Sequence, residues 1–383
     1  MFLEKYTDKF KDLSTPFYFY DIQLLNQTLS LLKESSHKYN YHIHYSLKAN
    51  SNPEILKLIK DNGFGADCVS GNEIIIAINN GFSNESLVFA GVGKTDAEIE
   101  IGLQNDIFCF NCESMQEIEV INELAKKNNK IAPIALRINP SVDALTHEYI
   151  NTGLHSSKFG IDKEDVPMVC ENIKHLTNIN LIGIHVHIGS QITDMKVYEE
   201  QCWVVNDLNR WFRQNGFNIK HLNVGGGLGI DYVDPNNSIP DFNIYFETIN
   251  KNLAVYNSQE VHFELGRSVV GQCGDLITKV LFMKENTHIH FAIVDAGFTE
   301  LIRPAFYNAY HKIESLTSTN PPKIYDVVGP ICESSDYMGK DVSLPEVKRG
   351  DLLVIRSAGA YGQVMSSNYN ARESANAYYS DQL

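Results

Sequence analysis

Short apolar runs of strand length recur between residues 42 and 264, and amphipathic stretches of helix length separate most of them. The stretches between the runs, such as 114–128, carry apolar residues three and four positions apart, and Ser114 with Glu117 resembles a capping box. Eight repeats of strand and helix predict an α/β protein whose first domain, residues 24–270, is a (β/α)8 TIM barrel. The eight predicted strands are 42–47, 64–68, 86–90, 107–110, 134–138, 181–187, 220–224 and 261–264.

The pattern changes after Gly271, where β-rich runs follow one another with little helical spacing between them. Phe17–Tyr20 has the composition of one further strand. We therefore predict a separate β-rich C-terminal domain, formed by residues 271–383 together with 1–23. Its apolar runs, bounded by Gly, Pro and Asn turns, are 276–283, 288–294, 324–328 and 352–355.

Composition and charge narrow the range of functions. The 383 residues are 43% hydrophobic and 21% charged, which is the usage of a folded globular protein. A formal net charge of −15 offers no general electrostatic surface for nucleic acid or anionic lipid, so neither is expected as a partner. We find no segment long enough to span a bilayer and no secretory signal in residues 1–13. Seven scattered cysteines, an odd number, favour a reduced, cytoplasmic protein.

The first predicted strand ends in Lys48, and in a TIM barrel the carboxyl ends of the strands form the active-site mouth. Partial desolvation there lowers the pKa of a lysine amine and frees it as a Schiff-base nucleophile. A single lysine at a strand end is more often a solvated surface residue. The role of Lys48 therefore depends on the other residues at the mouth.

Two further segments are expected at the same mouth. Gly225-Gly226-Gly227 follows the seventh strand, where bare backbone amides can approach a phosphate, although an ordinary tight turn would use the same residues. Glu264 and Arg267 end the eighth strand and could form a plain ion pair. In a functional interpretation, the Glu264 carboxylate keeps a pyridine nitrogen protonated, which makes that ring a strong electron sink, and Arg267 holds an anion.

No metal site is expected from the sequence. His185 and His187 alternate along one strand, but no adjacent carboxylate or third histidine completes a ligand set. We interpret one of the two rings as lying in the barrel and the other at a ligand face. Cys109 and Cys112 have redox spacing without a second pair, and we interpret that spacing as incidental. Cys332 precedes an acid and small polar residues, yet a buried structural thiol is equally consistent with the sequence.

Seven segments, taken in order, resemble the fold-type III pyridoxal-phosphate decarboxylases, and the resemblance covers nearly the whole chain. Within that family, the chain is most similar to the enzymes that act on diaminopimelate. The segments are Tyr45-Ser46-Leu47-Lys48-Ala49-Asn50, His187-Ile188-Gly189-Ser190-Gln191, Gly225-Gly226-Gly227, Glu264-Leu265-Gly266-Arg267, Arg303-Pro304-Ala305-Phe306-Tyr307, Cys332-Glu333-Ser334-Ser335-Asp336 and Gly359-Ala360-Tyr361-Gly362.

The resemblance implies pyridoxal 5'-phosphate as the cofactor, joined to Lys48 as an aldimine. His187 would stack on the cofactor ring and Glu264 would pair with the pyridine nitrogen. The other implied cofactor-binding residues are Asp67, Arg137, Ser190, Gly225, Gly226, Gly227, Gly266, Arg267 and Tyr361. The two carboxylates and the distal ammonium group of the substrate are assigned to Arg267, Arg303, Tyr307, Glu333 and Tyr361.

The implied reaction is the decarboxylation of meso-2,6-diaminopimelate to L-lysine and carbon dioxide, a step of lysine biosynthesis, with Cys332 as the proton donor. In the family the Cys-Glu segment reaches the site from a second subunit, so the resemblance implies a homodimer with shared active sites. Three alternatives stay open: a decarboxylase of ornithine, arginine or carboxynorspermidine, an amino-acid racemase of the same fold, and a non-catalytic cofactor-binding protein. Glu333 favours diaminopimelate, because ornithine enzymes of the family usually have Asp after the cysteine.

Two features depart from the family pattern. Leu265 stands where the family usually has proline, which leaves the turn carrying Gly266 and Arg267 less constrained. The tail after Asn370 is shorter than is common, which puts the last strand of the β domain in doubt.

Overall fold

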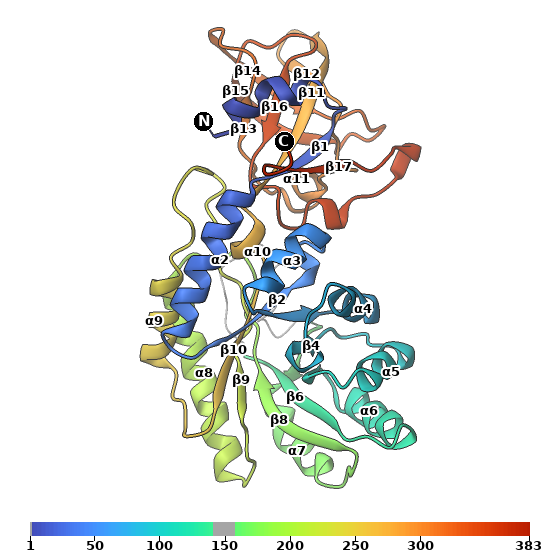
Figure 1. Ribbon diagram of the computed structural model, residues 1–383, viewed down its shortest axis with the longest axis vertical. Helices are drawn as coiled ribbons and strands as arrows, with labels where there is room; N and C mark the ends of the chain where they lie inside the picture. Colours follow the sequence, from blue (N-terminus) through green and yellow to red (C-terminus); the bar gives the residue numbers. More distant parts are fainter. Residues whose placement is uncertain (1, 141–157) are drawn as a thin grey trace. The chain divides into compact units, whose positions relative to one another are not determined.

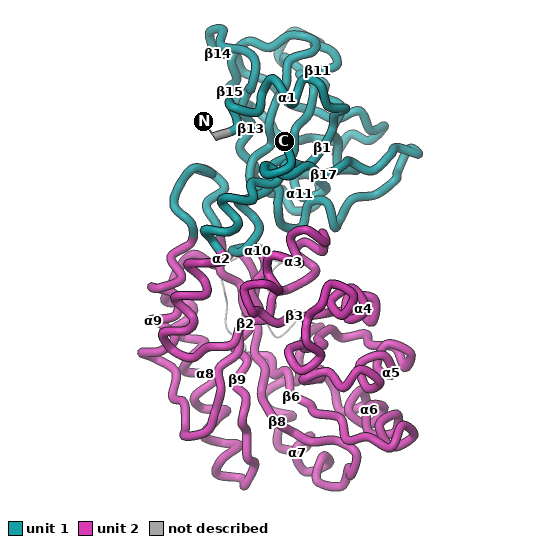
Figure 2. Tube along the Cα trace, viewed as in Figure 1, with its two compact units in different colours: residues 1–28, 230–239, 267–383 teal, residues 29–229, 240–266 magenta. Residues whose placement is uncertain are grey.

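A computed structural model of the chain describes residues 2–140 and 158–383. The chain divides into two compact units, drawn in different colours in Figure 2. We call residues 29–229 and 240–266 the barrel unit, and residues 1–28, 230–239 and 267–383 the β unit. Among the helices of the described residues, none combines the length and the apolar character that a membrane span requires.

The barrel unit contains a closed ring of parallel strands, in the order β5-β4-β3-β2-β10-β9-β8-β6, and pairing of β5 with β6 closes the ring. Figure 1 labels β2, β4, β6, β8, β9 and β10 of this ring. A short strand, β7 (Ile161–Asp162), pairs with the carboxyl end of β6, at Ile138 and Asn139. All eight predicted strands are present, so the predicted TIM barrel is confirmed. The strands are β2 (His42–Ser46), β3 (Gly65–Cys68), β4 (Leu87–Phe89), β5 (Cys109–Cys112), β6 (Ala132–Asn139), β8 (Ile179–His185), β9 (His221–Asn223) and β10 (Glu260–Leu265).

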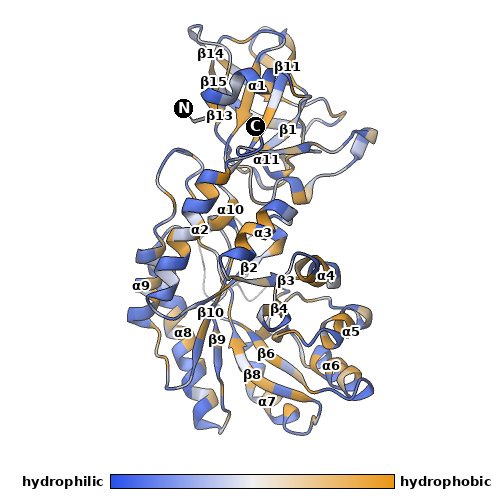
Figure 3. Cartoon of the chain, in the orientation of Figure 1, coloured by the Kyte–Doolittle hydropathy of each residue, from blue (hydrophilic) through white to orange (hydrophobic). Residues whose placement is uncertain are grey.

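The helices between these strands are amphipathic, and Figure 3 shows hydrophobic and hydrophilic residues sharing the same helices. In α3, for example, Ile55, Leu56 and Ile59 are buried while the flanking charged residues are not. Before the first strand comes α2 (Ile22–His37). The helices between the strands are α3 (Pro53–Asp61), α4 (Gly71–Asn79), α5 (Asp96–Gln104), α6 (Met115–Lys127), α7 (Val166–Ile173), α8 (Met195–Gln214) and α9 (Phe242–Asn252).

The start of α6 differs in detail from the expected capping box. Ser114 Oγ accepts the Glu117 N–H at 3.2 Å, as predicted. The Glu117 carboxylate, however, accepts from the Glu113 N–H at 2.7 Å and pairs with the buried Lys94 at 2.6 Å, so it does not reach back to Ser114. A nearby buried cation thus redirects the second half of the motif.

The β unit contains an eight-stranded mixed sheet. β1 (Phe17–Tyr20) pairs antiparallel with β11 and parallel with β17, so the N-terminal strand predicted for this domain is present. The final strand that the short tail put in doubt, β17 (Asn376–Tyr379), also forms. The remaining strands are β11 (Gly274–Glu285), β12 (His290–Val294), β13 (Ile313–Ser315), β14 (Pro322–Val328), β15 (Tyr337–Pro345) and β16 (Leu352–Ile355), with the short helices α10 (Arg267–Val270) and α11 (Arg303–Tyr307).

Histidines gather at the amino ends of the barrel strands. His44 on β2 and His262 on β10 are buried, and a hydrogen bond of 2.9 Å joins His44 Nε2 to His262 Nδ1. Burial lowers the pKa of His44 to about 4 and the pKa of His262 well below its ordinary range. Both rings are therefore neutral at pH 7. His42 and His221 begin β2 and β9 at the same end.

The N-terminal segment contributes aromatic side chains to the core of the β unit. Phe19 on β1 is fully buried, and its ring lies 4.9 Å, centroid to centroid, from the rings of both Tyr6 and Phe10. Ile277, Leu352 and other aliphatic side chains complete the cluster. The sheet and the N-terminal segment thus share one core.

We predict that Phe19→Ala lowers the free energy of unfolding by about 3–5 kcal/mol, because it leaves a cavity among these rings. Urea unfolding of the purified protein would measure the change. The matched control is Phe282→Ala on β11, where the residue is 54% exposed, and its cost should stay below about 1 kcal/mol. Equal losses in the two variants would contradict this account of the core.

Candidate functional site

Lys48 lies just beyond the carboxyl end of β2, in the short turn Leu47–Ala49. Its Nζ is 3.2 Å from Oδ2 of Asp67, which is fully buried on β3. The register of the two strands explains the contact, because Ser46 pairs with Asp67 directly before the turn. The Lys48 side chain itself is 39% exposed, so it is partly accessible to solvent.

Asp67 is surrounded by competing electrostatic effects. Burial raises the pKa of its carboxyl and the nearby charge of Glu264 adds to that effect, while Lys48 and the Ser46 hydroxyl oppose it. The net pKa lies above the ordinary range. The second oxygen, Oδ1, is buried without a hydrogen-bond partner among the described residues. The raised pKa and the contact with Lys48 Nζ thus suit Asp67 to accept a proton from the lysine amine.

Glu264 on β10 holds a buried charge in the barrel interior. Its Oε1 accepts from Asn111 Nδ2 at 3.0 Å and from Asn223 Nδ2 at 2.8 Å, and its Oε2 is 3.0 Å from His185 Nε2. Burial opposes ionisation, but His185 and then Lys48 outweigh it and hold the pKa of Glu264 well below its ordinary range. Glu264 is therefore a fixed carboxylate at neutral pH.

The glycine run after β9 allows close backbone approach. Gly225 and Gly227 have φ of 69° and 97°, and a Cβ at Gly226 would overlap the carbonyl oxygen of Glu264. Two of the amides already donate within the protein: Gly225 N–H to Asn223 Oδ1 at 2.9 Å and Gly226 N–H to His187 Nδ1 at 3.3 Å. A bound phosphate would therefore compete with the long bond to His187. Burial, followed by the charges of Arg137 and Lys48, lowers the pKa of His187, so its ring is neutral.

Arg137 on β6 makes a buried ion pair with Glu113, at 2.8 Å. Glu113 also accepts the N–H groups of Gly91 and Gly160, and the Arg137 guanidinium lies 4.7 Å above the ring of Phe159. Its ion pair is thus with the residue that follows β5, and the cofactor-binding role of Arg137 stays a prediction.

These groups of the barrel unit fit pyridoxal phosphate. An amine can bond an aldehyde, an ionised carboxylate can face a protonated pyridine nitrogen, and a neutral imidazole suits the face of the ring. The glycine backbone leaves room for a phosphate where a Cβ would collide with the protein.

A second polar cluster lies within the β unit. Arg267 and Arg303 begin α10 and α11 and are only 5% and 6% exposed. Both donate to the hydroxyl oxygen of Tyr232, at 2.6 and 2.8 Å, and Arg267 lies 4.9 Å from the ring of Tyr361. Burial raises the pKa of Tyr232, but the two guanidinium groups outweigh it and lower the pKa. Two buried cations around one hydroxyl are suited to an anion such as a carboxylate.

Cys332 and Glu333 lie elsewhere in the β unit and are exposed. The Cys332 N–H donates to Asn370 Oδ1, and Tyr369 OH donates to Glu333 Oε1 at 2.7 Å. Cys332 and Glu333 thus form hydrogen bonds with the C-terminal segment. Tyr307 is the last residue of α11, the helix that Arg303 begins. Exposure of Cys332 removes the alternative of a buried structural thiol.

Sequence reasoning missed several residues that complete these clusters. Asn111, Asn223 and Tyr232 belong to no motif used above. His185 was expected in the barrel or at a ligand face, but its partner Glu264 was not predicted. Polar side chains inside short apolar strands were the available signal for the two asparagines. Nothing in the sequence indicates that Tyr232 joins two arginines.

His311 links the arginine cluster to Arg356, the residue after β16. Its Nε2 is 2.9 Å from Arg303 Nη1, and its Nδ1 donates to the carbonyl oxygen of Arg356 at 2.8 Å. Burial, followed by the charge of Arg303, lowers the pKa of His311 to about 3. The unfolded chain therefore binds the proton first, at a pKa of about 6.5.

We predict that the contribution of neutral His311 to the free energy of unfolding is complete above pH ~6.5 and is lost as the pH falls toward ~3. The difference in free energy of unfolding between the wild type and His311→Gln should shrink by about 1.4 kcal/mol per pH unit in that range. Urea unfolding at a series of pH values measures it. His288→Gln, an exposed position of the same unit, is the control. If its difference in free energy of unfolding from the wild type changed with pH as that of His311→Gln does, the assignment would be refuted.

Comparison with known proteins gives a consistent picture. Residues 23–271 match the family model described as "Pyridoxal-dependent decarboxylase, pyridoxal binding domain". A diaminopimelate decarboxylase of Bacteroides thetaiotaomicron is 54% identical over 378 residues, covering 98% of each chain. One from Aquifex aeolicus is 43% identical and covers 94% of this chain and 85% of the relative.

Solved structures are similar over the same length. The crystal structure of diaminopimelate decarboxylase from Helicobacter pylori complexed with L-lysine superposes with a TM-score of 0.92 at 37% identity, covering 98% of this chain and 93% of that chain. The diaminopimelate decarboxylase structure from M. jannaschi gives a TM-score of 0.91 at 34% identity, covering 97% of this chain and 88% of the other.

Proposed function

The chain belongs to the pyridoxal-dependent decarboxylase family, whose cofactor is pyridoxal phosphate, and we propose that it converts meso-2,6-diaminopimelate to L-lysine and carbon dioxide. The observation that carries the proposal is the ionised Glu264, fixed by three hydrogen bonds in the same barrel unit as Lys48. The names of the relatives, and the L-lysine bound by the Helicobacter pylori enzyme, support the choice of substrate.

In this proposal, the Lys48 amine would hold the cofactor at its aldehyde carbon, with loss of water, and Glu264 would face its ring nitrogen. His187 would lie against the ring. Asp67 Oδ2, which already accepts a hydrogen bond from Lys48 Nζ and has a raised pKa, takes the proton that the amine must lose. The other cofactor-binding residues that we propose are Arg137, Ser190, Gly225, Gly226, Gly227, Gly266, Arg267 and Tyr361.

The bound cofactor supplies a protonated ring that accepts the electron pair left when carbon dioxide departs. Glu264 keeps that ring nitrogen protonated, because an ionised carboxylate held by three donors favours a cation opposite it. A racemase of the same fold gains from a weaker electron sink, so this carboxylate favours decarboxylation.

For the substrate, we propose that Arg267 and Arg303 bind carboxylates and that Glu333 binds the distal ammonium group, with Tyr307 and Tyr361 beside them. Guanidinium groups suit carboxylates through bidentate hydrogen bonds, and a carboxylate suits an ammonium group. Tyr232, which joins the two arginines, orients them for this task.

We predict that the purified holoenzyme releases carbon dioxide and L-lysine from meso-diaminopimelate, and does so at least tenfold faster than from ornithine, arginine or carboxynorspermidine. Identification of the product by mass spectrometry is the measurement. A preference for ornithine would overturn the substrate assignment. Lys48→Ala is the control for catalysis and should lose most of the activity. In the wild type, borohydride reduction should attach the cofactor to Lys48 and to no other lysine.

We further propose a homodimer in which Cys332 serves the site of the partner subunit as proton donor, in a reducing cytoplasm where the thiol stays free. The exposure of Cys332 supports this arrangement, since a donor shared between subunits must lie on the surface of the single chain. Sedimentation would test the dimer, and recovery of the activity in the cytoplasmic fraction of cells would test the location.

We predict that Lys48→Ala and Cys332→Ala homodimers each lose most activity and that mixing them restores part of it. A mixed dimer with shared sites combines Lys48 of one chain with Cys332 of the other. If each site used its own Cys332, no mixture could recover. The two variants are unfolded, mixed and refolded together, and refolding each variant alone in the same way is the control.

A further inference from the structure

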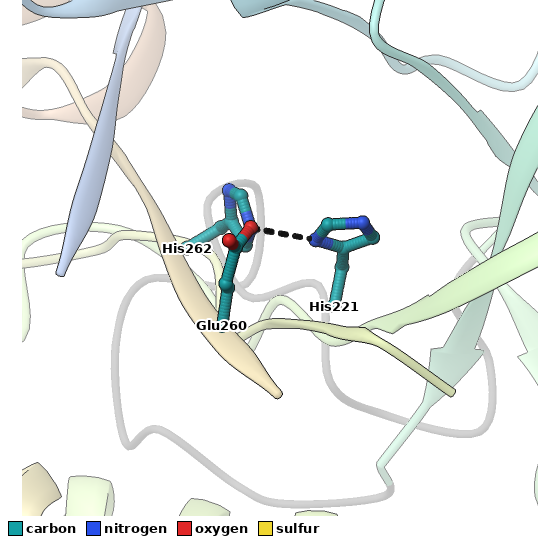
Figure 4. A group of neighbouring side chains, drawn as sticks. All are labelled: His221, Glu260 and His262. Atoms are coloured by element: carbon teal, nitrogen blue, oxygen red, sulfur yellow. Dashed lines mark hydrogen bonds and ion pairs between the residues drawn. The ribbon is translucent and has the colours of Figure 1, made fainter. Parts of the chain in front are cut away.

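The amino end of the barrel carries three metal-ligating side chains in contact. Figure 4 shows His221, Glu260 and His262 close together, and a dashed line joins Glu260 to His221. Strand register brings them together: Glu260 on β10 pairs with His221 on β9, and His262 follows two residues later on the same face of β10. The nearest ligand atoms are His221 Nδ1, Glu260 Oε2 and His262 Nε2.

The spacing of these atoms suits a small tetrahedral ion. Nδ1 of His221 lies 3.1 Å from Nε2 of His262, and the Glu260 oxygen lies 3.3 and 3.7 Å from the two nitrogens. A zinc ion with bonds of about 2.0–2.1 Å places neighbouring ligand atoms about 3.3–3.4 Å apart. The three atoms therefore already form one face of a tetrahedron of roughly this size.

Hydrogen bonds behind the cluster orient its lone pairs. The Ser86 carbonyl oxygen can only accept, so the proton of neutral His44 is on Nδ1, 3.0 Å away. His44 Nε2 then accepts from His262 Nδ1, which leaves a lone pair on His262 Nε2. That lone pair faces the Glu260 carboxylate, another acceptor. The His221 Nδ1 proton lies between the two, and His42 Nε2 is farther away, 4.0 Å from Glu260 Oε2. A cation satisfies all three atoms at once.

The cluster is also accessible. The side chains of Glu260 and His221 are 48% and 17% exposed, whereas that of His262 is 4% exposed, so an ion can enter from solvent and a water can fill the fourth position. His262 has a second hydrogen-bonding partner, as metal-binding histidines usually do.

We propose that His221, Glu260 and His262 bind one divalent transition-metal ion, with Zn²⁺ as the best match to two imidazoles and a carboxylate. The ion joins β9 to β10 at the end of the strands opposite Lys48. It therefore stabilises the barrel and takes no part in the chemistry at the other end.

The test uses untagged holoenzyme freed of metal by a chelator and dialysed against Zn²⁺. We expect one zinc per chain by elemental analysis and a rise in Tm with added Zn²⁺. His221→Ala and Glu260→Gln should weaken zinc binding at least tenfold and abolish the Tm rise. The matched control is His288→Ala, which removes an exposed histidine of the β unit. It should behave as the wild type.

Circular dichroism checks that each variant is folded, and Glu260→Gln keeps the shape of a half-exposed side chain. Cobalt offers an independent readout, because Co²⁺ in a tetrahedral site gives visible absorption bands that His221→Ala should remove. Zinc binding of equal affinity in the wild type and in both cluster variants would place the metal elsewhere and overturn the proposal. Failure of the wild type to bind zinc would overturn it directly.

Discussion

The ionised carboxylate of Glu264 inside the barrel is the constraint on which the barrel unit depends. Its three donors come from β5, β8 and β9, and β5 is not a neighbour of β10 in the sheet. Only a closed barrel can bring these side chains around one carboxylate. Leaving such a charge buried without partners costs about 3–5 kcal/mol. Barrel closure therefore brings together the donors that keep Glu264 ionised, and the proposed cofactor ring needs that ionised carboxylate.

The barrel strands carry different chemistry at their two ends. β2 begins at His42 and delivers Lys48 just past its last residue, while β10 begins at Glu260 and places Glu264 near its end. At the carboxyl ends the groups are an amine, carboxylates and glycines, which suit a reactive cofactor. At the amino ends they are histidines and one half-exposed carboxylate. This division matches the general separation in such barrels between a catalytic face and a stabilising face.

Much of the fold could be predicted because its signal is local. Apolar periodicity alone gave the position of each barrel strand, and β1 was visible as Phe17–Tyr20. Contacts between strands could not be predicted in this way, since they depend on register and closure. The pairing of Arg137 with Glu113, the donors to Glu264 and the convergence of His221 with His262 all arise from neighbours that are distant in sequence. The boundaries of the two domains and the assigned site residues stay predictions.

The departure at Leu265 shows how the structure replaces a constraint that the family obtains from proline. Proline would fix φ at this position and remove the N–H. Here β10 continues through Leu265, which is fully buried and pairs with Tyr45 of β2. Strand pairing and burial restrict the backbone up to Gly266, where the chain turns, and Arg267 then begins α10. On the barrel side of the turn, packing and strand pairing therefore supply restraints in place of the missing ring, and the lower constraint expected for the turn itself stays a prediction.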